Sequence, residues 1–511
     1  MSKLRRGFWI LFWAGLAARL LYVTAGFIEL SPDEAYYWQW SRRLDWSYYS
    51  KGPLVAFLIR LGTLIGGDTA FGVRLPTVIL SALTLYFSLR LYDRLFPKDD
   101  LGVFFMAVFY NTIPLMLVGS MIATIDPPLC AAWMGGTLAL HKAVRGERWG
   151  WAGLALALGF GIAAKYTMLL FLPTIFFYLL SSFENCLWMK RLKPYLAIAC
   201  GMTFLLTALI WNEQHQWVTY RHTMALGHIG AATQWPKNLI NFLEMMGTQA
   251  GVISPILFVL LIMGVWIHGS KLLHFFRDET YDGSALILSS CAPVFLFYFL
   301  LSFERPINAN WLAVVYPPAI LAGAQVCAEK WREGWGRKLL PAGAALGAIL
   351  CFGLLFSDVF HFLNLPQSQK WDPAARLKGW KDFAALAKKA ADGLPQDVPY
   401  FYFGDRYQTS SELSFYLEDH PWTLCASSVP LSNQYDVWGG SRQKIGWNGV
   451  FAMRDKRAES LILPWQVDKA FARVESAGEA TVVRYGKIIR CDRVWRCFDF
   501  KGWPMQVELN P

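Results

Sequence analysis

The chain has 511 residues, of which 55% are hydrophobic and only 17% are charged. This composition argues against a soluble enzyme, whose surface needs more charge, and it excludes a disordered chain, a collagen and a small disulfide-rich scaffold. The net charge of +11 first suggests a nucleic-acid partner. Most lysines and arginines, however, stand in short connections between apolar runs, as they do in membrane proteins. We therefore predict a polytopic membrane protein with a soluble part attached and no nucleic-acid partner.

Apolar runs that approach the roughly 20 residues needed for a membrane-spanning helix occur about eleven times. They lie near residues 7–29, 71–92, 101–121, 127–143, 149–164, 166–183, 194–211, 249–268, 283–302, 310–328 and 338–358. The stretch around Lys165 is too long for one span, so we predict two short or tilted helices that meet there. The predicted fold class is an α-helical polytopic membrane protein with about 11–13 transmembrane helices.

Basic residues mark every second connection between these runs. They precede the first run and follow the second, fourth, sixth, eighth and tenth, as Lys3, Arg5 and Arg6 do at the start and Lys190, Arg191 and Lys193 do after the sixth. By the positive-inside rule the N-terminus is then cytoplasmic. The outer side holds a loop at 30–70, turns at Asp126 and Lys165, loops at 212–248 and 303–309, and the chain after residue 359. We expect a multi-pass protein of the cell inner membrane.

The tail is predicted to be a second unit, so that residues 1–359 form a transmembrane domain and residues 360–511 a small periplasmic α/β domain. Its apolar runs are short, with helical periodicity over 374–392 and 407–418 and strand patterns near 398–403, 448–453, 480–489 and 494–500. Gly486 could turn a hairpin. Cys491 and Cys497 flank a short basic stretch that we predict to be a turn, and in an oxidising compartment they could form a disulfide.

The first outer loop opens with Ser31-Pro32-Asp33-Glu34. One interpretation is structural: serine at the N-cap, proline at the first helical position and glutamate two residues later form a capping box. The other is chemical: two carboxylates stand at the membrane surface, and one of them can act as a base. The two interpretations are compatible, because a cap that uses Glu34 leaves Asp33 free to project.

Aromatic residues are dense in the segment that follows, including Tyr37 and Tyr49. They could anchor a helix at the bilayer interface, or form a wall that stacks on a sugar or guides a lipid chain. Just behind them, Ser50-Lys51-Gly52-Pro53 predicts a tight turn that presents Lys51. A lone loop lysine is usually only solvated, so this signal is weak by itself.

Four further polar residues lie on the predicted outer side: Asp126, Lys165, Arg305 and Asn310. Asp126 and Asn310 could simply cap helices, and Lys165 could reach to the interface by snorkelling. A transporter should instead have ionisable groups near the bilayer midplane. Since these groups gather on one face beside a soluble domain, we predict an enzyme that acts on a lipid substrate from the outer surface.

Histidines in the loop at 212–248 raise the question of a metal. His215, His222 and His228 do not fall on one helix face at a spacing of four residues. This spacing gives no support to a divalent metal site, so no metal and no other cofactor is predicted.

Several segments, spread over nearly the whole chain, carry a resemblance to a known family. They are SPDEAYYWQWSRRLDWSYYSKGPLVAFLIRLG in the first loop, FGVRLPTVI, TIDPPL, AAKYTMLLFLP, INANWLAVVYP, and YQTSSELSFYL with NQYDVW in the tail. In these the chain resembles the polyprenyl-phosphate-sugar glycosyltransferases of the protein O-mannosyltransferase type, family 39 of the GT-C superfamily, and among them bacterial proteins related to the aminoarabinose transferase of lipid A.

The resemblance implies roles for individual residues. Asp33 matches the presumed base, with Glu34 and Asp126 as further catalytic acids. Lys51 matches the residue that contacts the lipid phosphate, although this chain has Lys-Gly-Pro where relatives often have Lys-Pro-Pro or His-Pro-Pro. The remaining expected substrate-binding residues are Lys165, Arg305, Tyr37, Tyr49 and Asn310.

The implied reaction moves a sugar from a polyprenyl phosphate, such as an undecaprenyl-type carrier, to lipid A, lipopolysaccharide or another envelope glycan by an inverting displacement. A carboxylate would stabilise the positive charge on the sugar ring, and cations would stabilise the leaving phosphate. The alternatives are a protein O-mannosyltransferase, a metal-dependent oligosaccharyltransferase-like enzyme and, outside enzymes, a lipid or glycan flippase.

Overall fold

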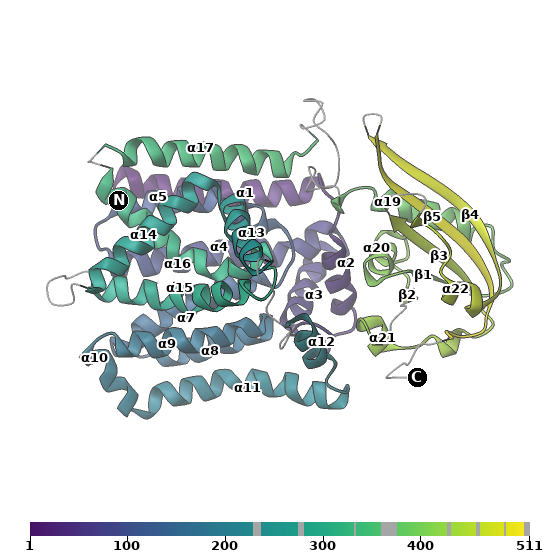
Figure 1. Ribbon diagram of the computed structural model, residues 1–511, viewed down its shortest axis with the longest axis horizontal. Coiled ribbons are helices and arrows are strands. Elements are labelled where there is room, and N and C mark those ends of the chain that lie inside the picture. The colour runs from purple at the N-terminus through teal and green to yellow at the C-terminus, as the bar shows by residue number, and fades with distance from the viewer. Residues whose placement is uncertain are drawn as a thin grey trace.

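The computed structural model describes residues 1–227, 237–273, 281–331, 334–358, 376–426, 431–455, 460–484 and 487–504. Figure 1 shows a bundle of long, roughly parallel helices and, at one end of it, a unit that contains the β-sheet. Three shorter helices, α2, α3 and α12, lie between the bundle and the sheet. The N-terminus lies at the end of the bundle that faces away from the sheet.

The helical part follows the predicted apolar runs. Its elements are α1 (Lys3–Ala25), α2 (Pro32–Ser41), α3 (Leu54–Gly66), α4 (Ala70–Leu95), α5 (Asp100–Thr112), α6 (Pro114–Leu117), η1 (Gly119–Met121), α7 (Asp126–Val144), α8 (Gly150–Ala164), η2 (Tyr166–Leu170), α9 (Phe171–Leu180), α10 (Phe183–Cys186), η3 (Leu187–Lys190), α11 (Leu192–Gln214), α12 (Val218–Gly227), α13 (Lys237–Ile253), α14 (Pro255–Leu273), α15 (Tyr281–Ser302), η4 (Ala309–Val315), α16 (Tyr316–Lys330) and α17 (Gly336–Leu355). Among the described residues, seven helices are long and apolar enough to cross a membrane, or eight if one bent pair counts as a span.

Exposure separates the centre of the bundle from its surface. The span formed by η4 and α16 is 94% buried within its apolar window, whereas the corresponding windows of α1 and α17 are only 17% and 22% buried. Large apolar side chains such as Ile10, Trp266 and Ile349 are exposed on the outer helices. In a membrane protein such side chains face lipid, so the arrangement fits a multi-pass protein.

Breaks in the helices have local causes. The predicted division at Lys165 is confirmed, because α8 ends at Ala164 and Lys165 is extended. Helices α5 and α6 are bent by 75°, since Pro114 has no N–H to donate and favours an extended Ile113 before it. The predicted span at 249–268 starts too early: α13 ends at Ile253, and Ser254 has a φ of 84° before α14 begins.

The outer loop at 30–70 contains a helix that the sequence did not indicate. Helix α3 buries Val55, Ala56 and Ile59 but leaves Leu64 and Ile65 66% and 75% exposed. An apolar strip of this kind on a helix too short to span the bilayer is typical of a helix that lies at the membrane surface.

The C-terminal unit confirms the predicted small α/β fold. It contains α19 (Trp380–Ala391), β1 (Tyr400–Gly404), α20 (Tyr407–Tyr416), β2 (Leu424–Cys425), α21 (Gln434–Trp438), η6 (Arg442–Lys444), β3 (Asn448–Asp455), α22 (Trp465–Ala470), β4 (Phe471–Arg484) and β5 (Lys487–Phe500). The sheet order is β2-β1-β3-β5-β4, parallel among β2, β1 and β3 and antiparallel from β3 to β4. The turn that was predicted at Gly486 lies outside the described residues, as does the proposed domain boundary at 359/360.

The two cysteines of the predicted disulfide lie on one strand. Cys491 and Cys497 both belong to β5, where they face Thr481 and Val474 of β4. Six residues along a strand span about 20 Å, far beyond the reach of a disulfide. Both thiols are free and buried, so the prediction of a bridge is wrong. The basic residues between the two cysteines belong to the strand and do not form a turn.

The first outer loop joins the bundle to the C-terminal unit. Most of its aromatic side chains are buried there: Trp38, Trp40 and Tyr48 have no exposed surface, and Trp38 packs edge-on against Phe415 of α20. They therefore form a core between the two parts of the protein. Trp46, which is 66% exposed, is the one that fits an interfacial anchor.

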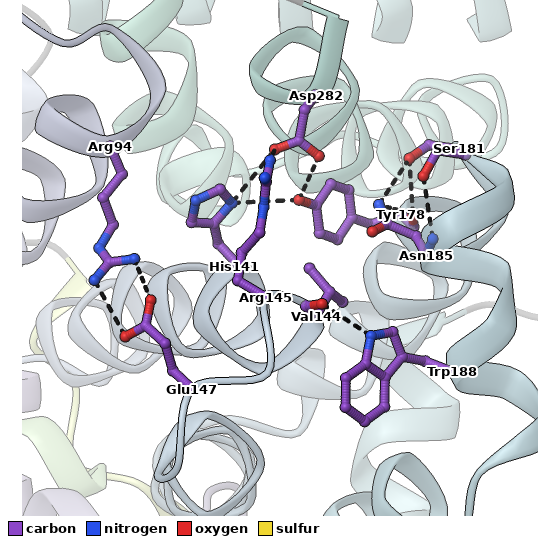
Figure 2. A network of polar contacts seen from close by, with 11 residues as sticks. Arg94, His141, Val144, Arg145, Glu147, Tyr178, Ser181, Asn185, Trp188 and Asp282 are labelled. Atoms are coloured by element: carbon purple, nitrogen blue, oxygen red, sulfur yellow. Dashed lines mark hydrogen bonds and ion pairs between the residues drawn. The ribbon is translucent and has the colours of Figure 1, made fainter.

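A polar network ties three helices together at the end of the bundle away from the sheet unit. Figure 2 shows His141 of α7, Arg145 just after it, Tyr178 of α9 and Asp282 of α15 pointing toward one another. The Tyr178 hydroxyl donates to Asp282 Oδ1 at 2.8 Å, and Arg145 donates to Asp282 Oδ2 at 2.6 Å. His141 Nδ1 lies 3.3 Å from the Tyr178 hydroxyl oxygen. The network fixes the relative positions of helices whose other ends reach the outer surface.

Asp282→Ala is expected to destabilise the bundle, because it leaves Tyr178 and Arg145 without their shared acceptor. Hydrogen bonds to a charged group contribute about 1.5–3 kcal/mol, so the thermal unfolding midpoint in detergent should fall clearly. Glu147→Ala is the control. It removes the partner of Arg94 in the same view, but the Glu147 side chain is 40% exposed against 28% for Asp282, so this pair should contribute less than about 1 kcal/mol. Equal shifts in the two variants would contradict the role of the network.

Candidate active site

The first turn of α2 is held by a capping box, as the sequence predicted. The Ser31 hydroxyl oxygen accepts from the Glu34 amide at 3.3 Å, and Glu34 Oε2 accepts from the Ser31 amide at 2.8 Å. Pro32 occupies the first helical position, where a missing N–H costs nothing. This cap fixes where the helix begins and hence the direction in which Asp33 projects.

Glu34 also forms a buried ion pair with Arg74 of α4. Arg74 donates from Nε to Oε1 at 2.7 Å and from Nη2 to Oε2 at 2.8 Å, and the Ala123 amide donates to Oε1 at 2.8 Å. Burial alone would raise the pKa of Glu34, but the charge and hydrogen bonds of Arg74 outweigh it and hold the pKa below its ordinary value. Both side chains are at most 1% exposed. Glu34 therefore has a structural role in place of the predicted catalytic one.

Asp33 lies on the open side of the same turn. Its carboxylate is exposed, and Oδ1 accepts from the Tyr407 hydroxyl of α20 at 3.3 Å. The surrounding protein displaces much of the water near the carboxylate, and this desolvation raises the pKa of Asp33, against the opposing effects of Tyr407 and Lys51. A carboxylate with a raised pKa is a better base near neutral pH than an ordinary aspartate.

Asp126, Lys165 and Asn310 form a second cluster, which is almost enclosed. Lys165 Nζ donates to Asp126 Oδ1 at 2.9 Å, and Asn310 Nδ2 donates to Oδ2 at 2.5 Å. The side chains of Lys165 and Asp126 are 13% and 11% exposed. Asp126 is the first residue of α7 and makes no cap, and Asn310 lies inside η4. Asp126 and Asn310 therefore do not act as helix caps, and Lys165 does not snorkel to the interface. The three side chains contact one another instead.

Lys51 lies between the two clusters. Asp33 and Asp126 attract its charge and Lys165 repels it, but burial is the main effect and lowers the pKa of Lys51. Within the described part of the chain its ammonium has no hydrogen-bond or ion-pair partner. A cation in this setting is ready to bind an anion from outside the protein.

Gly52 explains why this chain has Lys-Gly-Pro. A Cβ atom at Gly52 would lie 2.3 Å from the carbonyl oxygen of Ala163, so only glycine allows the loop to approach the end of α8 this closely. Ala163 is two residues before Lys165. The close contact thus brings the Lys51 turn beside the Lys165 turn.

The other predicted binding residues divide into near and distant ones. Tyr37 is buried on α2, and its hydroxyl interacts electrostatically with Asp33 and Asp126. Arg305 stacks over Trp311, 4.5 Å from the ring centroid, one residue along from Asn310. Tyr49 packs instead against His222, with ring centroids 4.8 Å apart, in the wall next to α12. The structure therefore does not bring Tyr49 into the acid–cation cluster.

A cavity of about 440 Å³ opens from this cluster into the helix bundle. Asp126 and Asn310 lie on its lining, together with Arg19 of α1, Asn111 of α5 and Ser120 of η1. Arg19 was missed in the sequence, although a charged residue inside an apolar run is itself a signal. Tyr407 was missed because its contact with Asp33 joins positions 374 residues apart, which no local pattern reveals.

The described residues contain no group of three or more His, Cys, Asp or Glu side chains that could hold a metal ion together. His228, one of the three histidines considered above, lies outside them.

Comparisons with known proteins agree with this arrangement. A family model described as dolichyl-phosphate-mannose-protein mannosyltransferase matches residues 50–211. The lipid A galacturonosyltransferase RgtD of Rhizobium johnstonii is 26% identical over 405 residues, which cover 77% of this chain and 79% of that protein. The undecaprenyl phosphate-alpha-4-amino-4-deoxy-L-arabinose arabinosyl transferase of Pseudomonas aeruginosa is 30% identical over 199 residues, 35% of this chain and 34% of that one.

Solved structures agree as well. ArnT from Cupriavidus metallidurans, crystallised in the apo state, matches 95% of this chain and 97% of its own with a TM-score of 0.60 at 15% identity. The same protein bound to undecaprenyl phosphate matches with the same TM-score. At this identity the structures establish the fold, and the sequence matches establish the type of enzyme. The resemblance seen in the sequence is thereby confirmed: the chain is a membrane glycosyltransferase that is similar to the family-39-like polyprenyl-phosphate-sugar transferases.

Proposed function

We propose that the chain transfers a sugar from a polyprenyl-phosphate donor to lipid A or a related envelope glycolipid. The relatives support both substrates, since one is named for lipid A and another for an undecaprenyl-phosphate-linked sugar. These relatives leave the sugar open between an acidic and an amino sugar. The observation that carries the proposal is the placement of an exposed carboxylate, Asp33, near Lys51, a cation without a partner in the described residues. Both lie near Asp126, which lines the cavity together with Asn310.

The donor phosphate would lie between Lys51 and Lys165. Charge builds on this phosphate as the bond to the sugar breaks, so cations placed there stabilise the transition state more than the ground state. Lys165 is already paired with Asp126 at 2.9 Å, so Lys51 supplies the uncompensated charge. Asp126, which is itself held by Asn310, keeps the Lys165 ammonium in a fixed direction and so spares the reaction the cost of ordering it.

Asp33 would act as the base. An acceptor hydroxyl attacks the anomeric carbon of the sugar, its proton passes to the Asp33 carboxylate, and the bond from that carbon to the phosphate oxygen breaks with its electron pair on the lipid phosphate. The sugar ring carries positive charge in such a transition state, and the Asp33 and Asp126 carboxylates also stabilise this charge. A single displacement inverts the anomeric centre. The Tyr407 hydroxyl orients the base.

The site would face the periplasm. Helix α2, which carries Asp33, lies at the end of the bundle next to the C-terminal unit, and the N-terminus lies at the opposite end. Basic residues accompany the N-terminal end in alternate connections, so the positive-inside rule gives a cytoplasmic N-terminus. The C-terminal unit, which we take as residues 360–511, then lies in the periplasm and contributes Tyr407 to a site formed mainly by the transmembrane domain.

Asp33→Asn is expected to lower transfer by about 10²-fold or more with normal expression. Asparagine keeps the size of the side chain and an acceptor for Tyr407 but cannot take a proton. The measurement is transfer from a purified polyprenyl-phosphate sugar to lipid A in detergent, where a flippase would form no product. Near-normal turnover by the variant would remove the base from the mechanism.

The pH profile provides the control for this prediction. A base works deprotonated, so kcat/KM should fall as the pH drops through the raised pKa of Asp33, at a midpoint above the ordinary 3.8. Tyr407→Phe removes a hydrogen bond that favours the charged carboxylate, so it should move the midpoint to higher pH. Tyr400→Phe changes a tyrosine away from Asp33 and should leave the midpoint unchanged.

Lys51→Ala is expected to weaken donor binding and to slow transfer by about 10²-fold. Lys51→Arg should recover part of this loss, because a guanidinium fork does not reproduce a compact ammonium. Lys381→Ala, which removes an exposed lysine of α19, is the matched control and should behave like the wild type. If Lys51→Ala also keeps wild-type kinetics with saturating and limiting donor, the phosphate lies elsewhere.

A further inference from the structure

Arg19 is a charged residue within the first membrane-spanning helix. It lies six residues before the end of α1 at Ala25, which places it about 9 Å along the helix axis from that end. Its Nε donates to the Ser120 hydroxyl oxygen at 2.7 Å, and its Nη1 donates to Asn111 Oδ1 at 2.8 Å and to the Gly15 carbonyl at 2.9 Å. A bond from Nη2 to the Tyr110 carbonyl at 3.2 Å completes the set.

All of these partners are neutral. Four hydrogen bonds occupy four of the five N–H groups of the guanidinium, but none of them balances its positive charge. The described residues include no carboxylate in contact with Arg19. A cation inside a membrane is costly unless it meets an anion or water. The protein therefore keeps an uncompensated charge at this position.

The charge faces the same cavity as the active site. Arg19 and Asp126 are the two side chains on the described lining of the 440 Å³ cavity that are charged at neutral pH. Asp126 is already satisfied by Lys165 and Asn310. The interior of the cavity is thus positive on balance, and its positive end is Arg19.

The bent helix next to Arg19 adds polar groups to this end of the cavity. Asn111 lies just before the 75° break that follows α5, and Ser120 lies in η1, near the end of the segment that follows the break. Ser81 and Thr84 of α4 also line the cavity. Irregular backbone at membrane depth is typical of a substrate site, because it frees polar groups to face a cavity.

The charge of Arg19 and the polar lining indicate which part of the donor, the polyprenyl chain or the sugar, would occupy this end of the cavity. A polyprenyl chain gains nothing from a guanidinium, and its burial there would leave the charge unpaired in hydrocarbon. A sugar ring attached to a phosphate at Lys51 and Lys165 would instead enter past Asp126 and bring hydroxyl groups to the polar lining. A carboxylate on that ring would supply the missing anion and accept a charged hydrogen bond from the remaining N–H group on Nη2.

We propose that Arg19 recognises a carboxylate on the transferred sugar, so that the donor is a polyprenyl-phosphate uronic acid rather than a neutral or an amino sugar. This inference rests on the proposed function. An amino sugar would place a second cation beside Arg19 and would be rejected. Arg19 then acts as a specificity residue: it touches the sugar but takes no part in bond making.

The alternative is that Arg19 only joins α1 to the bent helix. A purely structural residue would affect all donors in the same proportion, whereas a specificity residue changes the ratio between donors. The ratio is therefore the quantity to measure.

The experiment compares three synthetic polyprenyl-phosphate donors with the full-length protein in detergent. They carry galacturonic acid, galactose, which has a hydroxymethyl group in place of the carboxylate, and aminoarabinose. For the wild type we expect kcat/KM for the uronic acid to exceed that for galactose by about 10- to 100-fold, the value of one charged hydrogen-bonded contact. Aminoarabinose should be the poorest donor.

Two variants test the residue. Arg19→Gln should lower uronic acid transfer by about 10- to 100-fold, with galactose transfer within a few-fold of wild type, so that the ratio approaches one. Asn111→Asp places a carboxylate at the position that now accepts from Arg19. It neutralises the cation without removing it, and should lower the ratio in the same way even if Arg19→Gln fails to fold.

Three results would overturn the inference. One is a wild type that uses galactose as well as the uronic acid. Another is an equal loss with all donors in both variants, which would show a structural role. If no donor is used at all while the wild type is folded, the proposed function itself fails, and the inference fails with it.

Discussion

The buried pair between Glu34 and Arg74 is the contact on which the site depends. It joins the first turn of α2 to α4, and the Ala123 amide on the same carboxylate joins both to the segment before α7. Burying two charges is costly. The cost is offset here because the Arg74 guanidinium donates to both carboxylate oxygens of Glu34, and backbone amides donate to the same oxygens. Three segments that are far apart in sequence are thereby held at one point. Because Asp33 directly precedes Glu34 in the chain, this arrangement also fixes the direction in which Asp33 projects.

Charge is distributed unevenly around that fixed point. Glu34 is neutralised by Arg74, and Asp126 by Lys165, while Asp33 retains only a hydrogen bond from Tyr407 and Lys51 has no partner in the described residues. The paired groups give a rigid frame, and the unpaired ones remain for substrate. This division explains how a site can be both stable and reactive: the stabilising charges are buried and satisfied, and the reactive ones face the opening.

Sequence patterns predicted the bundle, the α/β tail and the capping box, because long apolar runs and local caps depend on neighbours in the chain. They also selected Asp33, Lys51, Asp126 and Lys165, which stand out as polar residues at predicted helix ends. They could not separate Glu34 from Asp33, since the difference lies in Arg74, which is 40 residues away. The disulfide was misjudged because strand β5 continues through a segment that was read as a turn.

The C-terminal unit shows the same limit of local patterns. Its fold could be predicted from alternating strands, but its contribution of Tyr407 to the site follows only from the packing of α20 on α2. The buried aromatic core between them, with Trp38 against Phe415, determines that packing. Aromatic density in the first loop was visible in the sequence, whereas the surface that covers it was not.

The most direct test of the account is a cryo-EM structure of the full-length protein with polyprenyl phosphate in a lipid nanodisc. We expect phosphate density between the Lys51 and Lys165 ammonium groups, with the Asp33 carboxylate facing it across the opening and the lipid chain leaving toward the membrane. Phosphate density at another position, with Lys51 directed into solvent, would contradict it.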